Sequence, residues 1–381
     1  MKKGSLLFTA VLIILWIVIF NPENVPASRS KASQERDQAR LAGLIWLAKH
    51  QNPDGSWGAQ SFPNQCPDRK CSAQGDGYFD IGVTGLALLA FTSVGYTQQS
   101  KDTYDDICFG DVVHKASSYL VDIQLSDGSF GGLKDGKFMY NQAVATYALC
   151  DVYALTMETP TGLLLKTPVE SAVKFILESQ NPRKGWRYQP KDGENDASVT
   201  GWVTLALKAA EQVNIPVPPK VFENIKSYYE SITEKNAGRG GYTWVGSIAL
   251  MAHEDPRTTV VQPTPTAIGV LVRLMLGNNT RDPLVVSGVK NIISRMPAWD
   301  ASKPGTIDYY YWYYGSYCLY RYDGPGGENW RKWAEQKDKV ILKNQRPKSG
   351  GCAAGSWDAI DRWGGEGGRV YSTAINIITL Q

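Results

Sequence analysis

Apolar residues along the chain fall into two kinds of segment that alternate. Segments of the first kind, such as residues 41–48, carry one apolar stripe at the spacing of an amphipathic helix. Segments of the second kind, such as residues 80–91, are apolar on nearly every side and predict helices that are covered all round. The pattern therefore predicts pairs of helices in two layers, an outer layer with one wet face and an inner layer shielded by it.

Several of the amphipathic segments end in the same turn. In three turns a glutamine precedes an aromatic residue by six positions, and a fourth turn has a longer spacing. A glutamine amide at the end of a helix can contact an aromatic ring and still bond a free backbone group, so we interpret these residues as structural. The pairs are Gln51 with Trp57, Gln124 with Phe130, Gln180 with Trp186, and Gln345 with Trp357.

These turns, together with the alternating helices, resemble the QW repeat of the squalene–hopene cyclase and prenyltransferase superfamily. The resemblance covers the chain from about residue 40 to its end. It implies an all-α fold, an (α/α)6 toroid of six helix pairs, and such a ring closes on itself without capping repeats. We expect residues 38–381 to form this single domain and residues 28–37 to be a polar linker.

The N-terminal residues are typical of a targeting segment. Lys2 and Lys3 precede an apolar run over residues 6–20, which is shorter than the roughly 20 residues that a spanning helix needs. We favour a signal peptide, residues 1–27, cleaved after Ala27. An uncleaved N-terminal anchor, with membrane association through residues 5–20, is the alternative. Both interpretations place the rest of the chain outside the cytoplasm, periplasmic or secreted.

Net charge bears on possible binding partners, and the cysteines bear on possible disulfides. The formal net charge is +3 and no block of Lys and Arg stands out, so a nucleic-acid partner has no electrostatic support. In an oxidising compartment Cys66 and Cys71, which bracket a short loop, could form a local disulfide. Cys108 and Cys352 also fall in predicted loops, and the sequence does not pair them.

Three aspartates are candidates for chemistry. The inner helices of such a ring run parallel, so their N-termini meet at one mouth, and Asp80, Asp196 and Asp308 stand at such helix starts. In squalene–hopene cyclases a DxDD motif at this place supplies the acid that protonates an alkene. Residues 194–198 are the nearest match here and keep only one carboxylate of the pair. A lone aspartate at a helix start is also typical of an N-cap, which the helix dipole stabilises as an anion.

Two other motifs of related proteins are incomplete. Protein prenyltransferases hold zinc with Asp, Cys and His; Asp106, Cys108 and His114 have that composition but precede an outer helix, away from the site of that family. Residues 351–355 lack the Glu-Gln of the thioester motif in complement-like proteins. We therefore expect no metal and no cofactor.

Aromatic residues are the remaining signal. Residues 308–314 place aromatic side chains on every face of one inner helix. Such a wall can steady carbocations, hold a sterol-like lipid or stack on a sugar, although large aromatics at helical spacing also form ordinary core. The residues expected to line the barrel cavity are Tyr147, Thr200, Trp202, Tyr309, Trp312 and Tyr313.

These features lead to two functional hypotheses. The first is an exported, non-catalytic toroid that binds a hydrophobic, terpenoid-like or lipid-like molecule, or a protein, at the barrel mouth. The second is a terpenoid cyclase in which Asp196, with Asp80 or Asp308, acts as general acid. Two-barrel cyclases are about twice as long as this chain, which counts against the second hypothesis.

Overall fold

The computed structural model describes residues 30–66, 70–131, 136–247, 263–277, 279–303 and 305–381. The predicted signal peptide or anchor, residues 1–27, lies outside these residues. Within the described ranges, no helix has both the length and the apolar character that a membrane span requires.

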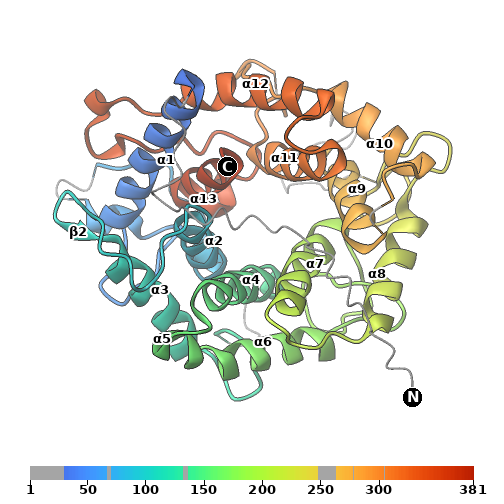
Figure 1. The fold of residues 1–381 in the computed structure, drawn as a ribbon, viewed down its shortest axis with the longest axis horizontal. Coiled ribbons are helices and arrows are strands. Elements are labelled where there is room, and N and C mark those ends of the chain that lie inside the picture. Colours follow the sequence, from blue (N-terminus) through green and yellow to red (C-terminus); the bar gives the residue numbers. More distant parts are fainter. Residues whose placement is uncertain (1–29, 67–69, 132–135, 248–262, 278, 304) are drawn as a thin grey trace, which may run out of the picture.

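The helices form two concentric rings (Figure 1). The inner ring consists of α2 (Asp80–Ser93), α4 (Phe138–Thr156), α7 (Ala197–Gln212), α9 (Thr264–Gly277), α11 (Tyr309–Asp323) and α13 (Gly364–Thr379). The outer ring consists of α1 (Lys31–Lys49), α3 (Phe109–Asp122), α6 (Lys166–Glu178), α8 (Pro219–Ile232), α10 (Pro283–Ile293) and α12 (Glu328–Lys343). Because the last inner helix, α13, packs against the first, α2, the inner ring is closed. The predicted all-α (α/α)6 toroid is confirmed.

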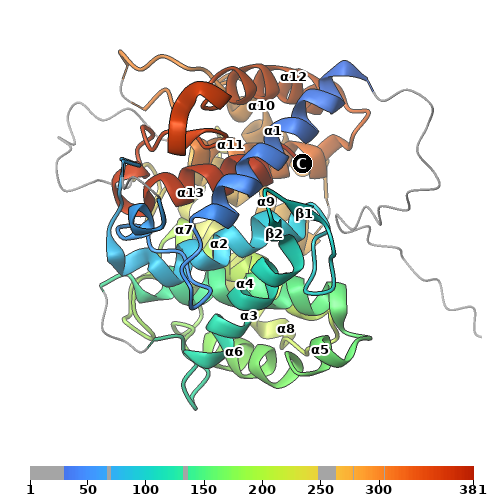
Figure 2. The same cartoon turned by 90° about the vertical axis from the view of Figure 1, so that its left-hand side faces the viewer.

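Short elements decorate the loops between these helices. They are η2 (Phe62–Gln65), η3 (Gly77–Phe79), α5 (Pro160–Leu163), η4 (Lys348–Ala353), and the antiparallel pair β1 (Thr103–Tyr104) and β2 (Ile107–Cys108). From the side, α1 is seen to lie across α2 and α13, the two helices that close the inner ring (Figure 2).

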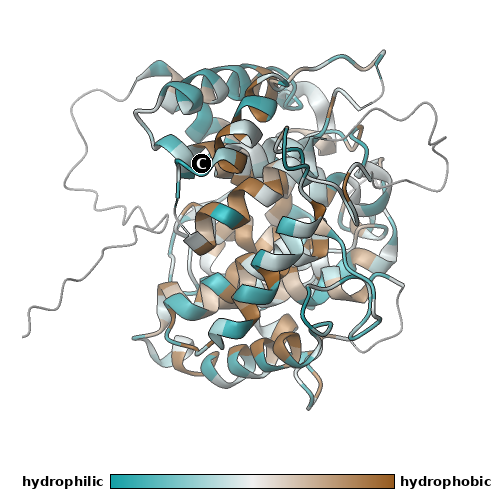
Figure 3. Cartoon of the chain, turned by 90° about the vertical axis from the view of Figure 1, so that its right-hand side faces the viewer, coloured by the Kyte–Doolittle hydropathy of each residue, from teal (hydrophilic) through white to brown (hydrophobic). Residues whose placement is uncertain are grey.

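The alternation of apolar and amphipathic segments reflects the burial of the inner and outer helices. Inner helix α7 is buried from Ala197 to Leu207, whereas outer helix α8 buries one stripe and leaves its other face wet. In Figure 3 hydrophilic residues, in teal, are frequent on the outer helices, and hydrophobic residues, in brown, on the helices behind them. An all-round apolar helix is stable in water only when neighbours cover every side, and the ring provides that cover.

The boundary of the domain differs from the prediction. Residues 28–37 were expected to be a linker, but α1 already begins at Lys31. The Ser30 side chain caps this helix by accepting a hydrogen bond from the Ser33 N–H at 3.3 Å. Arg36 bonds Asp338 of α12 at 2.8 Å, so the polar first turns belong to the outer ring. Burial begins only at Ala39, which explains why the hydrophobic pattern missed them.

The glutamine of each recurring turn joins two repeats. Its Nε2 donates one hydrogen bond to a carbonyl of its own turn and a second to a carbonyl of another outer helix. Gln51 donates to Gly55 (2.9 Å) and Val112 (3.0 Å), and Gln124 donates to Gly128 (3.3 Å) and Pro168 (2.9 Å). Gln180 donates to Lys184 (2.9 Å) and Val221 (3.4 Å). Gln345 donates to Gly355 (2.7 Å) and Ala39 (2.7 Å). The bond from Gln345 to Ala39 of α1 connects the last repeat with the first.

The aromatic residue of the turn makes the remaining links. The indole N–H of Trp186 donates to the Ile176 carbonyl of its own outer helix at 3.0 Å, and Trp57 and Trp357 make the same kind of bond. The backbone N–H of Trp186 donates to Thr200 Oγ1 of the inner helix at 3.1 Å. Each such turn thus fastens an outer helix to its inner partner and to the next pair.

We predict that Gln345→Ala destabilises the ring at its seam. The substitution leaves two backbone carbonyls without their donor, which costs roughly 1–3 kcal/mol of the free energy of unfolding. Urea unfolding of the variant beside the exposed Gln99→Ala control measures this cost. Equal stability of the two variants would show that the link is dispensable.

Candidate functional site

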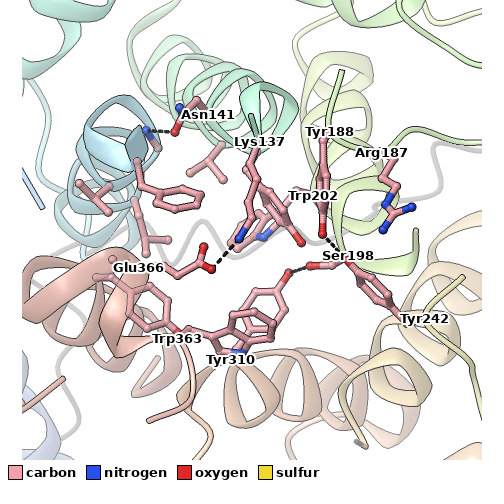
Figure 4. Close-up of a pocket in the computed structure, with 18 of the residues that line it drawn as sticks. Lys137, Asn141, Arg187, Tyr188, Ser198, Trp202, Tyr242, Tyr310, Trp363 and Glu366 are labelled. Atoms are coloured by element: carbon pink, nitrogen blue, oxygen red, sulfur yellow. Dashed lines mark hydrogen bonds and ion pairs between the residues drawn. The ribbon is translucent and has the colours of Figure 1, made fainter. Parts of the chain in front are cut away.

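A cavity of about 440 Å3 opens at the mouth where the inner helices begin (Figure 4). It is lined by residues from α2, α4, α7, α11 and α13 and from the loops before α7 and α9. Aromatic side chains form much of its wall. The aromatic lining consists of Phe79, Tyr140, Tyr188, Trp202, Tyr242, Trp244, Tyr310, Trp363 and Tyr371.

An ion pair lies in the wall of this cavity. Lys137, just before α4, and Glu366, in the first turn of α13, point toward one another, and Lys137 Nζ lies 2.5 Å from Glu366 Oε1. Both side chains stay partly accessible. Among the described residues that line the cavity, Glu366 is the one carboxylate. It is therefore the acidic group best placed to touch a bound molecule.

Hydroxyl groups form a polar rim on the wall beside α7. Ser198 Oγ lies 2.5 Å from the Tyr310 hydroxyl, and the hydroxyls of Tyr188 and Tyr242 are 3.1 Å apart. The Arg187 guanidinium lies over the ring of Tyr188, 4.8 Å from its centre. A mostly apolar pocket with a few fixed polar groups can bind a molecule and also orient it.

Asp196 lies directly behind this rim. It is fully buried and caps α7, with Oδ1 accepting a hydrogen bond from the Val199 N–H at 2.8 Å. Its Oδ2 lies 3.9 Å from Arg187 Nε. Burial raises the pKa of Asp196 to about 7, against the opposing effects of the Val199 N–H, the Tyr242 hydroxyl and Arg187. This carboxyl can therefore gain or lose a proton near neutral pH.

The other two predicted acids are also held at helix starts. Asp80 Oδ1 accepts a hydrogen bond from the Ala59 N–H at 2.7 Å, and burial raises its pKa to about 6. Asp308 caps α11 by accepting from the Tyr311 N–H at 2.8 Å, and burial raises its pKa as well. Neither these two nor Asp196 belongs to the lining of the mouth cavity. The three acids therefore do not face one shared cavity, as a cyclase that used them together would need, because backbone donors hold each of them in the wall.

The predicted cavity aromatics divide between two places. Trp202 lines the mouth cavity, whereas Tyr147 and Tyr313 line a second cavity of about 590 Å3 toward the C-terminal ends of the inner helices. The rings of Trp202 and Tyr313 stack with centroids 5.5 Å apart. This stack lies between the two cavities, so the barrel interior is not one continuous space.

Three other predicted cavity residues line neither of these cavities. Thr200 bonds the turn at Trp186, as described above, and does not reach the mouth cavity. Tyr309 and Trp312 pack against Trp299, with centroids 6.0 and 6.2 Å from it. The helical phase of α11 places Tyr310, the next residue, in the mouth cavity instead.

The two residues of the ion pair in the cavity wall were not among the predicted site residues. Glu366 stands in the run Gly364-Gly-Glu-Gly-Gly368, directly ahead of an apolar segment. In the structure α13 begins at Gly364, with a break at Gly368, whose φ is 63°. A glutamate between glycines ahead of an apolar helix is the signal that could have found it.

The predicted disulfide between Cys66 and Cys71 is also corrected. Both residues are free thiols in the structure. Cys71 Sγ instead lies 2.9 Å from Cys352 Sγ, a residue for which the sequence offered no partner.

Comparisons with known proteins support the fold. No protein-family model matches the chain, and no curated protein matches it in sequence. Among solved structures, the GH76A α-1,6-mannanase from Salegentibacter sp. HEL1_6 is similar, with 10% identity, a TM-score of 0.58, and coverage of 92% of this chain and 100% of that one. The type II terpene cyclase MstE from Scytonema is similar at 14% identity and a TM-score of 0.54, covering 91% and 97%. Such low identities show the shared toroid fold alone.

The comparisons correct the expectation of a non-catalytic protein, because both solved structures named above are enzymes built on this fold. The sequence pattern led to a non-catalytic protein that binds a hydrophobic ligand, with a terpenoid cyclase as the alternative. The mannanase, an enzyme that acts on a glycan, matches over nearly the whole chain with a higher TM-score than the cyclase. An ion pair in the cavity wall also differs from what a purely hydrophobic ligand requires.

The raised pKa of Asp196 predicts a measurable pH dependence of stability. An unfolded aspartate loses its proton near pH 4, whereas Asp196 in the folded chain keeps it up to about pH 7. The stability that this group contributes is thus complete below about pH 4 and is lost as pH rises through 7. Asparagine at position 196 can still cap α7 but does not titrate. Between pH 5 and pH 8 the unfolding free energy of Asp196→Asn should therefore rise by roughly 2 to 3 kcal/mol relative to that of the native chain.

Urea unfolding of both proteins across that pH range tests this expectation. Asp111→Asn, at an exposed aspartate in the first turn of α3, serves as the control and should keep a constant difference from the native chain. A constant difference for Asp196→Asn as well would mean that Asp196 is ionised in the folded chain throughout.

Proposed function

We propose that this chain is a glycoside hydrolase that cleaves an α-linked hexose polymer bound at the mouth of the toroid. The observation that carries the proposal is the carboxylate of Glu366 in an open, aromatic-walled cavity. The similarity of fold to the α-1,6-mannanase supports it, as that enzyme is also known in an inactive form, with two aspartates replaced by asparagine, bound to α-1,6-mannotriose.

The walls suit a sugar because a pyranose has apolar faces and a polar edge. Rings such as Trp202 and Trp363 offer flat surfaces for the C–H faces, in the way that aromatic side chains combine an apolar body with directional contacts. The hydroxyls of Ser198 and Tyr188 and the ammonium of Lys137 then meet the sugar hydroxyls. The cavity volume of about 440 Å3 is that of a small-ligand site open to a longer chain.

Hydrolysis of a glycosidic bond commonly needs two carboxyl groups, one to protonate the leaving oxygen and one to activate water or attack the sugar. We assign the second task to Glu366, which lines the cavity. We assign the first to Asp196, whose pKa of about 7 leaves it partly protonated at neutral pH. Its proton reaches the leaving oxygen through the Tyr242 hydroxyl, which lies beside Asp196, lines the cavity and adjoins the hydroxyl of Tyr188. Water adds its hydroxyl to the sugar and gives its proton to Glu366, and exchange with solvent then returns a proton to Asp196 and removes one from Glu366.

The expected location of the chain agrees with such a substrate. An exported enzyme meets polysaccharides of cell walls and extracellular matrices, which do not cross membranes. The predicted leader over residues 1–27 is therefore part of the same proposal.

Glu366→Gln should abolish hydrolysis while leaving the fold intact. The purified protein is incubated with α-1,6-mannan and with other α-linked and β-linked hexose polymers, and new reducing ends are counted. Loss of the carboxylate should lower the rate on the preferred polymer about 100-fold to 10,000-fold. The matched control is Glu328→Gln, which breaks an exposed Lys–Glu pair of 2.6 Å on α12 and should retain full activity.

Two results would contradict the proposal. One is that the native chain releases no reducing ends from any of these polymers. The other is that Glu366→Gln cleaves at the native rate, in which case the cavity carboxylate has no part in the chemistry.

A further inference from the structure

One histidine and three cysteines from the two ends of the chain meet beside the end of α1. His50 follows α1, Cys66 and Cys71 stand in the next loop, and Cys352 lies in η4. His50 Nε2 lies 3.1 Å from Cys66 Sγ and 3.4 Å from Cys71 Sγ. Cys71 Sγ in turn lies 2.9 Å from Cys352 Sγ. The ligand atoms of His50, Cys66 and Cys71 all lie within 4.8 Å of one another, and Cys352 stands beside them through its contact with Cys71.

The orientation of His50 fits a metal ligand. Its Nδ1 lies 2.7 Å from the Trp46 carbonyl oxygen. A carbonyl can only accept, so Nδ1 carries the hydrogen and the lone pair of Nε2 faces the sulfur atoms. The imidazole also stacks on the Trp46 indole with centroids 4.1 Å apart, which fixes the plane of the ring. Histidines that bind metals commonly donate their other ring N–H to a backbone carbonyl in this manner.

The size of the cluster suits a tetrahedral ion. Zinc binds sulfur at about 2.3 Å and imidazole nitrogen at about 2.0 Å, so its ligand atoms lie roughly 3.5–3.8 Å from one another. His50 Nε2 lies 3.1 and 3.4 Å from the sulfur atoms of Cys66 and Cys71, and Cys71 lies 2.9 Å from Cys352, so outward movements of less than about 1 Å bring these pairs to the spacing of zinc ligands. Cys352 then completes the set by turning toward the other three ligands. His50, Cys66 and Cys71 are buried, which is typical of a closed structural site.

We propose that these four side chains bind one structural zinc ion in a Cys3His site. Three thiolates and a neutral imidazole around Zn²⁺ leave one negative charge. Arg369, which also pairs with Asp358 at 2.8 Å, lies close by, since its Nε donates to the carbonyl of Ser72, the residue after Cys71, at 3.1 Å. Thiolate and imidazole ligands in a closed tetrahedral set select zinc over magnesium or calcium, which prefer oxygen.

The ion would lie across the seam of the ring. Cys66 and Cys71 belong to the first helix pair and Cys352 to the last, so the metal holds the two ends of the chain together. The loop that it fixes continues to Asp76, whose N–H donates to the Glu366 carbonyl at 2.7 Å. The site therefore steadies the segment that carries the cavity carboxylate, without touching the cavity itself.

Metal analysis of the full chain, purified without chelator, tests this inference. We expect about one zinc per chain in the native protein and less than about one tenth of that in Cys66→Ser and Cys352→Ser. Cys108→Ser, at a half-buried thiol outside the cluster, should keep its zinc. Exchange with Co²⁺ should produce the visible and near-ultraviolet bands of tetrahedral cobalt thiolate. A native protein that holds no zinc and takes up no cobalt would overturn the site.

A count of thiols distinguishes zinc from a disulfide, and it needs no variant to fold. The native chain is unfolded in chelator without reductant and alkylated. With a zinc site all six cysteines react. Two fewer would mean a disulfide within the cluster, such as Cys71 to Cys352, which an oxidising compartment favours, and that result would refute the metal site.

Discussion

Closure of the ring is the constraint on which the rest of the structure depends. The inner helices are apolar nearly all round, so an open ring would leave the free sides of α2 and α13 exposed to water, at a large cost in free energy. The two ends fit closely at the seam. A Cβ atom on Gly368, whose φ is 63°, would lie 2.6 Å from the backbone nitrogen of Gly75, so these two loops pass each other at a point where no side chain fits.

The same closure assembles the mouth cavity. Glu366 comes from the last inner helix, Phe79 directly precedes the first inner helix, and Lys137 directly precedes the second inner helix, α4. These residues are far apart in the sequence and become neighbours only when α13 packs against α2. Stability and function are therefore coupled, because a weaker seam would separate the carboxylate from its ammonium partner and from the aromatic wall.

The fold could be predicted because it depends on patterns within short segments of the sequence. The alternation of amphipathic and apolar segments and the spacing from Gln180 to Trp186 each involve residues within one helix pair. The cavity depends instead on helical phase and on contacts between distant segments. On α11 a difference of one residue along the helix determines that Tyr310, and not Tyr309, lines the mouth cavity. No spacing in the sequence relates Cys71 to Cys352, because the ring alone brings them together.

The central claim, that the mouth cavity binds a glycan for cleavage at Glu366, is tested most directly by a crystal structure. Crystals of the Glu366→Gln variant are soaked with α-1,6-mannotriose. The account predicts a trisaccharide that lies against Trp202 and Trp363, with a glycosidic oxygen or anomeric carbon facing the substituted side chain. A trisaccharide seated in the cavity at the opposite end of the barrel, beside Tyr147 and Tyr313, would contradict it.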